Sequence, residues 1–349
     1  MRLISALAMM SLGLSAVNAD QPVQIQQVPQ CWASTGVAEY ADTDSLAACS
    51  LPDGRTLVFA SEKKANRVDV FDALTGKLIA VIGKPGAGVG EFAYPNGVIV
   101  ASFAVGKGEQ GSEKTRAAVL IVERDNARVQ AFWADTLKPA GVFGMGKLNK
   151  PYGGAISYRD GAVYLYVTDT ECAPERTVSV FRLTCDGERV AGEFVRSFGD
   201  ASGPGQIHEA ESIAVDDKLG RVLLCDEDET QADVKVYTTE GSFTGVTFGK
   251  GDIRREPEGV VVLDQPGAGV VILTDQRQEI SVWNVYDRKT YQRITVFTGD
   301  PLISNTDGIC VHAGPVGQHK RGLFLAVNND LDVRAYPLDT ILTTIEAAK

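Results

Sequence analysis

The chain has 349 residues, a formal net charge of −11, six cysteines and three histidines. This negative balance disfavours nucleic acids and anionic membrane surfaces as partners, because both carry charge of the same sign. After residue 19, no stretch approaches the ~18 uninterrupted apolar residues of a transmembrane helix, so we expect no membrane span.

The first residues of the chain, Met1–Ala19, have the pattern of a secretory signal peptide. Arg2 provides the basic start, an apolar run follows, and Val17-Asn18-Ala19 forms a small-residue cleavage site. We therefore expect a single domain over residues 20–349, located in the periplasm or secreted.

The cysteines lie in that mature chain, where disulfides could form. They are Cys31, Cys49, Cys172, Cys185, Cys225 and Cys310. Cys225 and Cys310 fall inside expected strands, so a buried free thiol is the favoured interpretation for each. No Cys-x-x-Cys pair occurs, which disfavours a structural zinc site.

Residues 207–249 contain four short apolar segments separated by turn-forming residues. The segments are Ser212–Val215, Arg221–Cys225, Asp233–Tyr237 and Phe243–Phe248. Their composition predicts four antiparallel strands in a meander, which has the size of one propeller blade. A single blade cannot bury its two faces, so further copies are expected.

The signature of the third segment, aliphatic-x-small-aromatic, occurs six times in the chain. The copies begin at Val68, Val129, Val178, Val234, Ile280 and Val333. An apolar strand precedes each copy, and before that strand stands a polar residue or Tyr followed by Gly or Ser. These leading pairs are Asp44-Ser45, Asn96-Gly97, Tyr152-Gly153, Glu211-Ser212, Glu258-Gly259 and Asp307-Gly308. Amphipathic helices are missing between the strands, so the pattern predicts an all-β, six-bladed β-propeller of four-stranded antiparallel blades.

The sequence of the sixth blade provides only three of its four expected strands. Val23–Trp32 alternates like a strand before the first blade begins. Because a ring with a bare sheet edge invites aggregation, we expect this N-terminal strand to complete blade six and close the ring. The alternative is an N-terminus that packs against nothing.

Charged residues gather in the loops that lead into the first strand and leave the second strand of each blade. In an up-and-down blade these loops emerge on one face. Acids concentrate in blades four to six and at Asp42 and Asp44, and bases concentrate in blades one and two. Crowded carboxylates repel unless a cation holds them, and oxygen ligands at this density favour Ca²⁺. The alternative interpretation is a set of solvated acidic loops.

Several short motifs at these positions resemble those of the β-propeller phytases. They are Asp42-Thr-Asp44, Glu62-Lys63-Lys64, Pro151-Tyr152-Gly153, Glu211-Ser-Ile-Ala-Val-Asp-Asp217, Asp226-Glu227-Asp228, Pro257-Glu258-Gly259, Asn305-Thr-Asp307-Gly308 and Gly322-Leu-Phe-Leu325. The resemblance covers most of the mature chain and is weakest in blades two and three. It implies a secreted, calcium-dependent phosphomonoester hydrolase with a six-bladed fold, and we expect a monomer that acts on a small phosphorylated substrate.

The resemblance also assigns roles to residues. It implies metal ligation, with several Ca²⁺ ions possible, by Asp44, Tyr152, Glu211, Asp226, Glu227, Glu258 and Asp307. Glu211, Glu227 and Glu258 would take part in the catalytic activation of water. It implies that the phosphate groups are held by Lys63, Lys64 and Arg124.

The chain departs from the phytase pattern at three places. Ser45 replaces one of two paired aspartates, the stretch Asn96–Val100 lacks an arginine, and Thr170 stands where the family has a lysine. Blade two is similar to NHL-type repeats. We therefore expect weakened activity, and two alternatives stay open: a metal-dependent lactonase similar to the gluconolactonases, and a non-catalytic propeller that binds a ligand or a protein.

Overall fold

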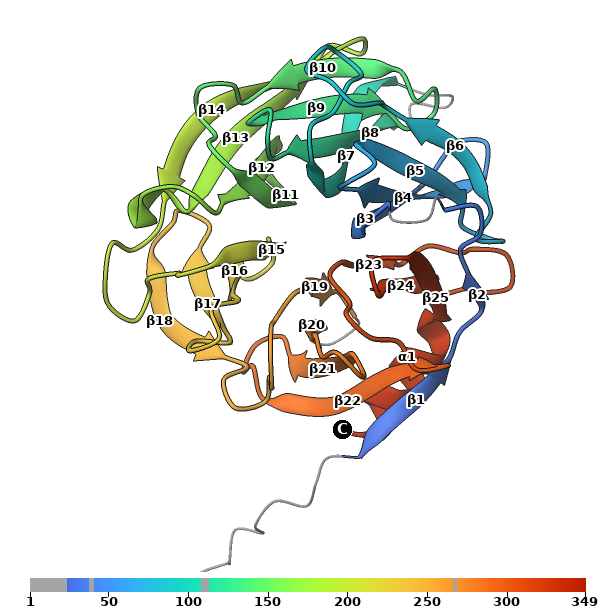
Figure 1. Cartoon of the computed structure of the whole chain (residues 1–349), viewed down its shortest axis with the longest axis vertical. Helices are drawn as coiled ribbons and strands as arrows, with labels where there is room; N and C mark the ends of the chain where they lie inside the picture. Colours follow the sequence, from blue (N-terminus) through green and yellow to red (C-terminus); the bar gives the residue numbers. More distant parts are fainter. Residues whose placement is uncertain (1–23, 38–40, 108–112, 266–268) are drawn as a thin grey trace, which may run out of the picture.

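The computed structural model describes residues 24–37, 41–107, 113–265 and 269–349, and it shows six β-sheets arranged around a central channel (Figure 1). Each sheet contains a four-stranded antiparallel blade, so the prediction of an all-β, six-bladed propeller is confirmed. The predicted signal peptide lies outside the described residues. Within the described ranges, no helix has the length and apolarity that crossing a membrane would require.

The strands of the first three blades follow one another along the chain. Blade one contains β3 (Thr43–Ser50), β4 (Thr56–Glu62), β5 (Arg67–Asp72) and β6 (Leu78–Ile82). Blade two contains β7 (Pro95–Lys107), β8 (Glu113–Glu123), β9 (Arg128–Trp133) and β10 (Pro139–Phe143). Blade three contains β11 (Pro151–Arg159), β12 (Ala162–Asp169), β13 (Val178–Cys185) and β14 (Val190–Phe198), with the short 3-10 helix η2 (Pro174–Arg176) before β13.

The second half of the ring repeats this order. Blade four contains β15 (Ala210–Asp216), β16 (Arg221–Asp226), β17 (Asp233–Thr238) and β18 (Phe243–Phe248). Blade five contains β19 (Val260–Leu263), β20 (Val270–Asp275), β21 (Val282–Asp287) and β22 (Arg293–Asp300). Blade six contains β23 (Ile309–His312), β24 (Leu323–Asn328) and β25 (Asp332–Pro337), and its fourth strand comes from the N-terminus.

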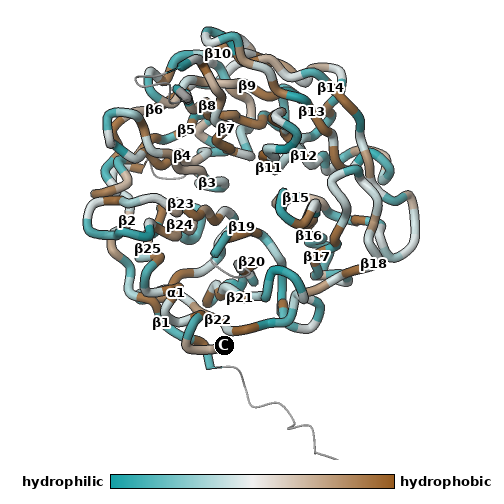
Figure 2. Tube along the Cα trace, turned by 180° about the vertical axis from the view of Figure 1, so that it is seen from behind, coloured by the Kyte–Doolittle hydropathy of each residue, from teal (hydrophilic) through white to brown (hydrophobic). Residues whose placement is uncertain are grey.

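The second and third strands of each blade form the core. Every residue of β4 and β20 is buried, because neighbouring blades cover both faces of these strands. Strands buried on two faces are continuous apolar runs rather than alternating ones. Figure 2 shows the hydrophobic segments concentrated in the blade interiors and the hydrophilic ones in the connecting loops.

One aromatic residue from each third strand occupies an equivalent place between neighbouring blades. These residues are Phe71, Phe132, Phe181, Tyr237, Tyr286 and Tyr336, and all are buried. In blade five this register differs from the one expected from sequence. Ile280 precedes β21, and Trp283 pairs with Thr274 as Val234 pairs with Cys225 in blade four. The signature of blade five is therefore Trp283-Asn-Val-Tyr286, three residues later than predicted.

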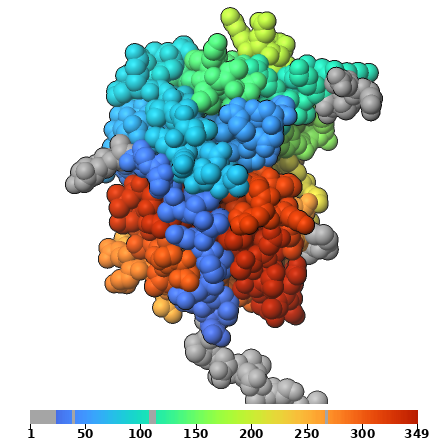
Figure 3. Space-filling model, turned by 90° about the vertical axis from the view of Figure 1, so that its right-hand side faces the viewer, coloured from blue at the N-terminus to red at the C-terminus, as the bar shows by residue number. Residues whose placement is uncertain are grey.

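The N-terminal segment closes the ring, as predicted, but most of it attaches to a different blade. Only β2 (Trp32–Ala33) pairs with β25 and supplies the fourth strand of blade six. The preceding β1 (Ile25–Pro29) pairs in parallel with β22 and adds a fifth strand to blade five. The main-chain N–H of Thr35 then donates a hydrogen bond to the carbonyl oxygen of Gly76 in blade one. Figure 3 shows this segment running across the outer surface over blades five and six.

The chain ends in a helix rather than in the short tail expected from sequence. Helix α1 (Leu338–Ala347) buries Leu338, Ile341, Leu342 and Ile345 in the same cluster as Val28 of β1. The two ends of the chain therefore share one hydrophobic core at the junction of blades five and six. All six cysteines lie within the described residues and are free thiols.

Candidate functional site

The first strands of the six blades line the central channel, a cavity of about 350 Å³. At one end the channel meets a smaller polar cavity of about 40 Å³, which we call the neck. The neck is lined by Asp44, Ser45, Gly97, Tyr152, Gly153, Glu211, Ser212, Glu258, Asp307 and Gly308. All six leading pairs recognised in the sequence contribute to it. Four contribute both residues, whereas blade two contributes only Gly97 and blade five only Glu258.

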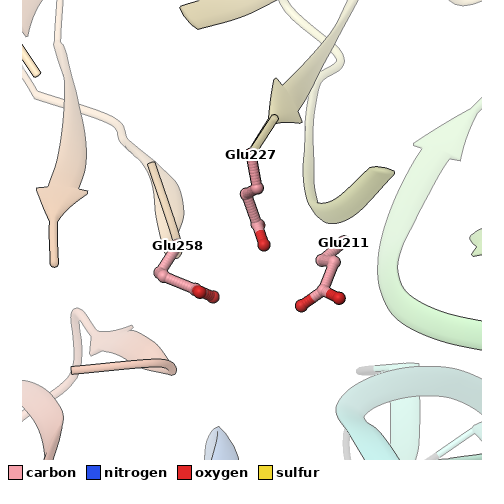
Figure 4. Close-up of side chains that lie close together, drawn as sticks. All are labelled: Glu211, Glu227 and Glu258. Atoms are coloured by element: carbon pink, nitrogen blue, oxygen red, sulfur yellow. The ribbon is translucent and has the colours of Figure 1, made fainter. Parts of the chain in front are cut away.

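Three glutamates from two neighbouring blades converge at the neck. Glu211 lies in β15, Glu227 directly follows β16, and Glu258 precedes β19. One carboxylate oxygen from each lies within 4.8 Å of the others, and Figure 4 shows the three side chains directed toward one point. Glu227 is 5% exposed, and its Oε1 has no hydrogen-bond partner among the described residues.

Burial and mutual repulsion raise the pKa values of the three glutamates. Burial, with the charge of Asp44 added, raises the pKa of Glu211 to about 7. The pKa values of Glu227 and Glu258 are raised well above their ordinary range, first by burial and then by neighbouring carboxylates. Burial and the surrounding acids also raise the pKa of the Tyr152 phenol, so its hydroxyl keeps its proton at neutral pH. A bound divalent cation would remove the repulsion.

The small residue after each leading residue is required by the convergence of the inner strands. A Cβ added to Gly153 would lie 2.3 Å from the Glu211 carbonyl oxygen, and one added to Gly308 would lie 2.2 Å from the Asp44 carbonyl oxygen. The main chain at Gly153 and Gly308 therefore lies directly against the leading residue of the next blade, which explains the glycine at these two positions.

Asp226 does not belong to the triad, although it was predicted as a metal-side residue. Its fully buried carboxylate accepts the main-chain N–H groups of His208 and Glu209, and it pairs with Lys235 at 2.7 Å. Asp169 and Asp275 hold the equivalent loops in blades three and five in the same way. These acids position the loops that lead into the first strands. Of the residues that follow them, Glu227 joins the triad and Gln276 contacts Asp307.

In blade one the residue that follows the buried acid is Lys63, after Glu62. Its ammonium lies inside a group of aspartates. Nζ is 2.6 Å from Asp44 Oδ2, 3.5 Å from Asp307 Oδ2 and 4.0 Å from Asp42 Oδ1. Burial lowers the pKa of Lys63, but these three charges outweigh burial and raise it above its ordinary value. Asp307 has a pKa raised to about 8 by burial and by Asp44.

The other two predicted phosphate-side residues remain accessible. The Lys64 side chain is 68% exposed and lies 3.1 Å from Asp42. The Arg124 side chain is 32% exposed, its guanidinium lies over the Tyr94 ring, and it is 3.9 Å from Glu171. Thr170, where the resembled family has a lysine, hydrogen-bonds to the Lys150 carbonyl.

Sequence reasoning missed Gln276, whose amide donates a hydrogen bond to Asp307 Oδ1. Gln276 follows the buried Asp275 as Lys63 follows Glu62 and Glu227 follows Asp226. Alignment of the six blades on their buried acids would have found it. His208, by contrast, is held by Asp226 through Nδ1 at 3.2 Å, on a cavity between blades three and four.

Comparison with known proteins identifies the fold alone. No protein-family model matches the chain, and no curated protein matches it. A solved complex of BBS1N with ARL6DN contains a similar chain, with a TM-score of 0.50, 9% identity, and coverage of 89% of this chain and 97% of the other. A chain of the mitotic checkpoint complex is similar with a TM-score of 0.50, 11% identity, and coverage of 95% and 98%. Both similar chains are propellers found in protein complexes.

Proposed function

We propose that this protein is a calcium-dependent phosphomonoester hydrolase that works at the neck of its central channel. The single observation that carries the proposal is the buried Glu227 carboxylate, which points into the triad with one oxygen lacking a partner among the described residues. A buried acceptor of this kind is costly unless a ligand satisfies it. Glu211 and Glu258 each bring a carboxylate oxygen within 4.8 Å of one of its oxygens, and both are acidic.

The donor atoms of the triad suit a hard cation. They are carboxylate oxygens within 4.8 Å of one another, without cysteine or histidine among them. Ca²⁺ takes several carboxylate ligands in a flexible geometry, whereas Mg²⁺ retains most of its waters and demands a stricter octahedron. Glu211, Glu227 and Glu258 would hold the ion, and when bound it would supply charge stabilisation and lower the pKa of water.

The protein residues around the triad can bind and orient a phosphate ester. Lys64 presents an exposed cation and Arg124 a partly exposed one on the same face of the ring, where they can contact phosphoryl oxygens. The Tyr152 hydroxyl lies beside Glu211 and can donate a hydrogen bond. The substrate would be a small phosphorylated molecule, and export under the signal at residues 1–19 would place the reaction outside the cytosol.

A binding propeller without catalysis is the second candidate. Two observations favour it: Thr170 is neutral where the family has a lysine, and Lys63 is surrounded by aspartates rather than open to a substrate. The similar propellers are also found in protein complexes. A lactone hydrolase with one metal at the same triad is the third.

Phosphate release tests the main proposal. Purified protein would be assayed on p-nitrophenyl phosphate and phytate, with calcium and with a chelator. We expect weak calcium-dependent release that Glu227→Gln abolishes, and that Glu229→Gln, an exposed acid in the same loop, leaves intact. If calcium binds but neither substrate is hydrolysed, the hydrolase proposal fails. Hydrolysis of a lactone would then identify the third candidate, and inactivity on it would favour the binding propeller.

A further inference from the structure

Lys63 is enclosed by the acids of the neck. Its side chain is 11% exposed, and its ammonium approaches Asp44 and Asp307, from blades one and six, at 2.6 and 3.5 Å. Asp42 lies at 4.0 Å. On the other side of Asp307, Oδ1 accepts a hydrogen bond from Gln276. Asp44 and Asp307 are therefore already paired with a cation of the protein.

The glutamate side of the neck has no such partner. Among the described residues, none of the ion pairs within 4 Å of a Lys, Arg or His nitrogen involves Glu211, Glu227 or Glu258. The two sides of the neck thus differ in how their carboxylates are paired. One half contains its own cation, and the other contains carboxylates without any positive charge in contact.

We infer that Lys63 acts as a built-in counter-cation at Asp44 and Asp307, so that the neck binds one divalent cation, at the glutamate triad, and not two. This inference rests on the metal site of the proposed function. A second divalent ion between Asp44 and Asp307 would have to displace the Lys63 ammonium, and removing the partners of a buried charge is strongly destabilising.

Lys63 is consequently a residue that sets metal stoichiometry. Contact with substrate phosphate is left to Lys64 and Arg124.

Calcium stoichiometry measured by titration calorimetry on the chelator-stripped protein tests this role, with metal content after dialysis as a second readout. We expect one ion in the wild type and two in Lys63→Gln, because Asp44 and Asp307 then face one another without a cation. Lys63→Arg keeps the charge and should bind one. Lys64→Gln removes the same charge from the adjacent, exposed residue and should also bind one.

The outcomes separate this inference from the proposed function. One ion in both the wild type and Lys63→Gln overturns the inference and leaves the triad standing. Two ions in the wild type also overturn it. No ion in the wild type overturns the metal site and the inference with it. If Lys63→Gln does not fold, Asp44→Asn decides: one bound ion supports the inference, and loss of the ion contradicts it.

Discussion

The hydroxyl of Thr168, at the end of β12 in blade three, donates a 2.8 Å hydrogen bond to the main-chain carbonyl of Glu211 in blade four. The same hydroxyl accepts the N–H of Gly153 at 2.8 Å. Thr168 is fully buried. The main chain of one triad residue is therefore held by the neighbouring blade, and the position of its carboxylate depends on contact between blades.

Thr168→Val should weaken calcium binding without removing a ligand. Valine has the same shape but cannot make either hydrogen bond, and leaving the buried Glu211 carbonyl unsatisfied costs about 1–3 kcal/mol. We expect roughly tenfold weaker binding by calorimetry, at 1.4 kcal/mol per tenfold, and a lower melting temperature.

Thr274→Val is the matched control. Thr274 precedes Asp275 as Thr168 precedes Asp169, and its buried hydroxyl has no hydrogen-bond partner among the described residues. Its replacement should leave calcium affinity unchanged and stability unchanged or improved. Equal effects of the two substitutions would contradict the role given to the contact between Thr168 and Glu211.

Calcium should stabilise the fold by binding to the folded state alone. At ~100 times its Kd, the ion would contribute about 2.7 kcal/mol to the free energy of unfolding. Glu211→Gln with Glu258→Gln should abolish this shift, and the metal-free variant should be at least as stable as metal-free wild type because repulsion is relieved. Thermal melts with calcium and with chelator measure both effects. A wild type that melts at the same temperature in both would point to solvated acidic loops.

Introducing a lysine at Thr170 should increase phosphatase activity. Thr170 lines a cavity of about 160 Å³ with His208 on the face of the ring that carries the triad. A cation there would stabilise the negative charge of a phosphorylated substrate. We expect kcat/KM for phytate to rise more than that for p-nitrophenyl phosphate, since phytate carries more phosphates. If the ratio of kcat/KM for phytate to kcat/KM for p-nitrophenyl phosphate is the same in Thr170→Lys as in the wild type, this result would argue against the cavity as a substrate site.

Glu62 should make the metal-free protein less stable as the pH rises. Burial, with the charge of Asp69, raises the pKa of Glu62 from 4.5 to about 8. The folded state thus favours the neutral acid, so its contribution is complete below pH 4.5 and is lost as the pH rises through the folded pKa. Glu62→Gln imitates the neutral form and should remove this loss.

Chemical unfolding at about pH 5 and about pH 8.5 measures the effect. At the higher pH, the free energy of unfolding of Glu62→Gln should exceed that of the wild type by up to a few kcal/mol, at about 1.4 kcal/mol per pKa unit. Glu175→Gln, an exposed acid in η2, should behave like wild type. An equal gain for Glu62→Gln at both pH values would contradict the assignment to ionisation.

Removal of the N-terminal segment through Ala33 should open the ring. It deletes β1 and β2, removes the buried Val28 from the core it shares with α1, and exposes the edges of β22 and β25. Unpaired strand edges promote aggregation. We expect a lower melting temperature and higher oligomers in size-exclusion chromatography, whereas removal through Gln24 should change neither. An unchanged melt after the longer deletion would show that the segment does not close the propeller.

The number and order of the blades could be predicted from sequence because every blade must bury the same strands. Apolar runs separated by turn residues repeat for that reason, and the six buried aromatics repeat with them. In blade five, however, Ile280-Ser-Val-Trp283 matches the signature, whereas the structure uses Trp283-Asn-Val-Tyr286, which has Trp in place of the aliphatic residue. Only pairing with β20 selects Trp283 over Ile280, because strand register depends on the partner strand.

The sequence also predicted that Glu211, Glu227 and Glu258 would face one mouth, because chain direction places their loops there. It could not separate Asp226 from Glu227, since adjacent residues point to different surroundings and only the fold shows what fills each one. Nor could it show that Lys63 lies among aspartates from blades one and six, or that β1 joins blade five. Contacts between residues more than 200 positions apart, such as Lys63 with Asp307, exist only once the ring has closed, so the tertiary structure alone decided where the charges of this site are already paired.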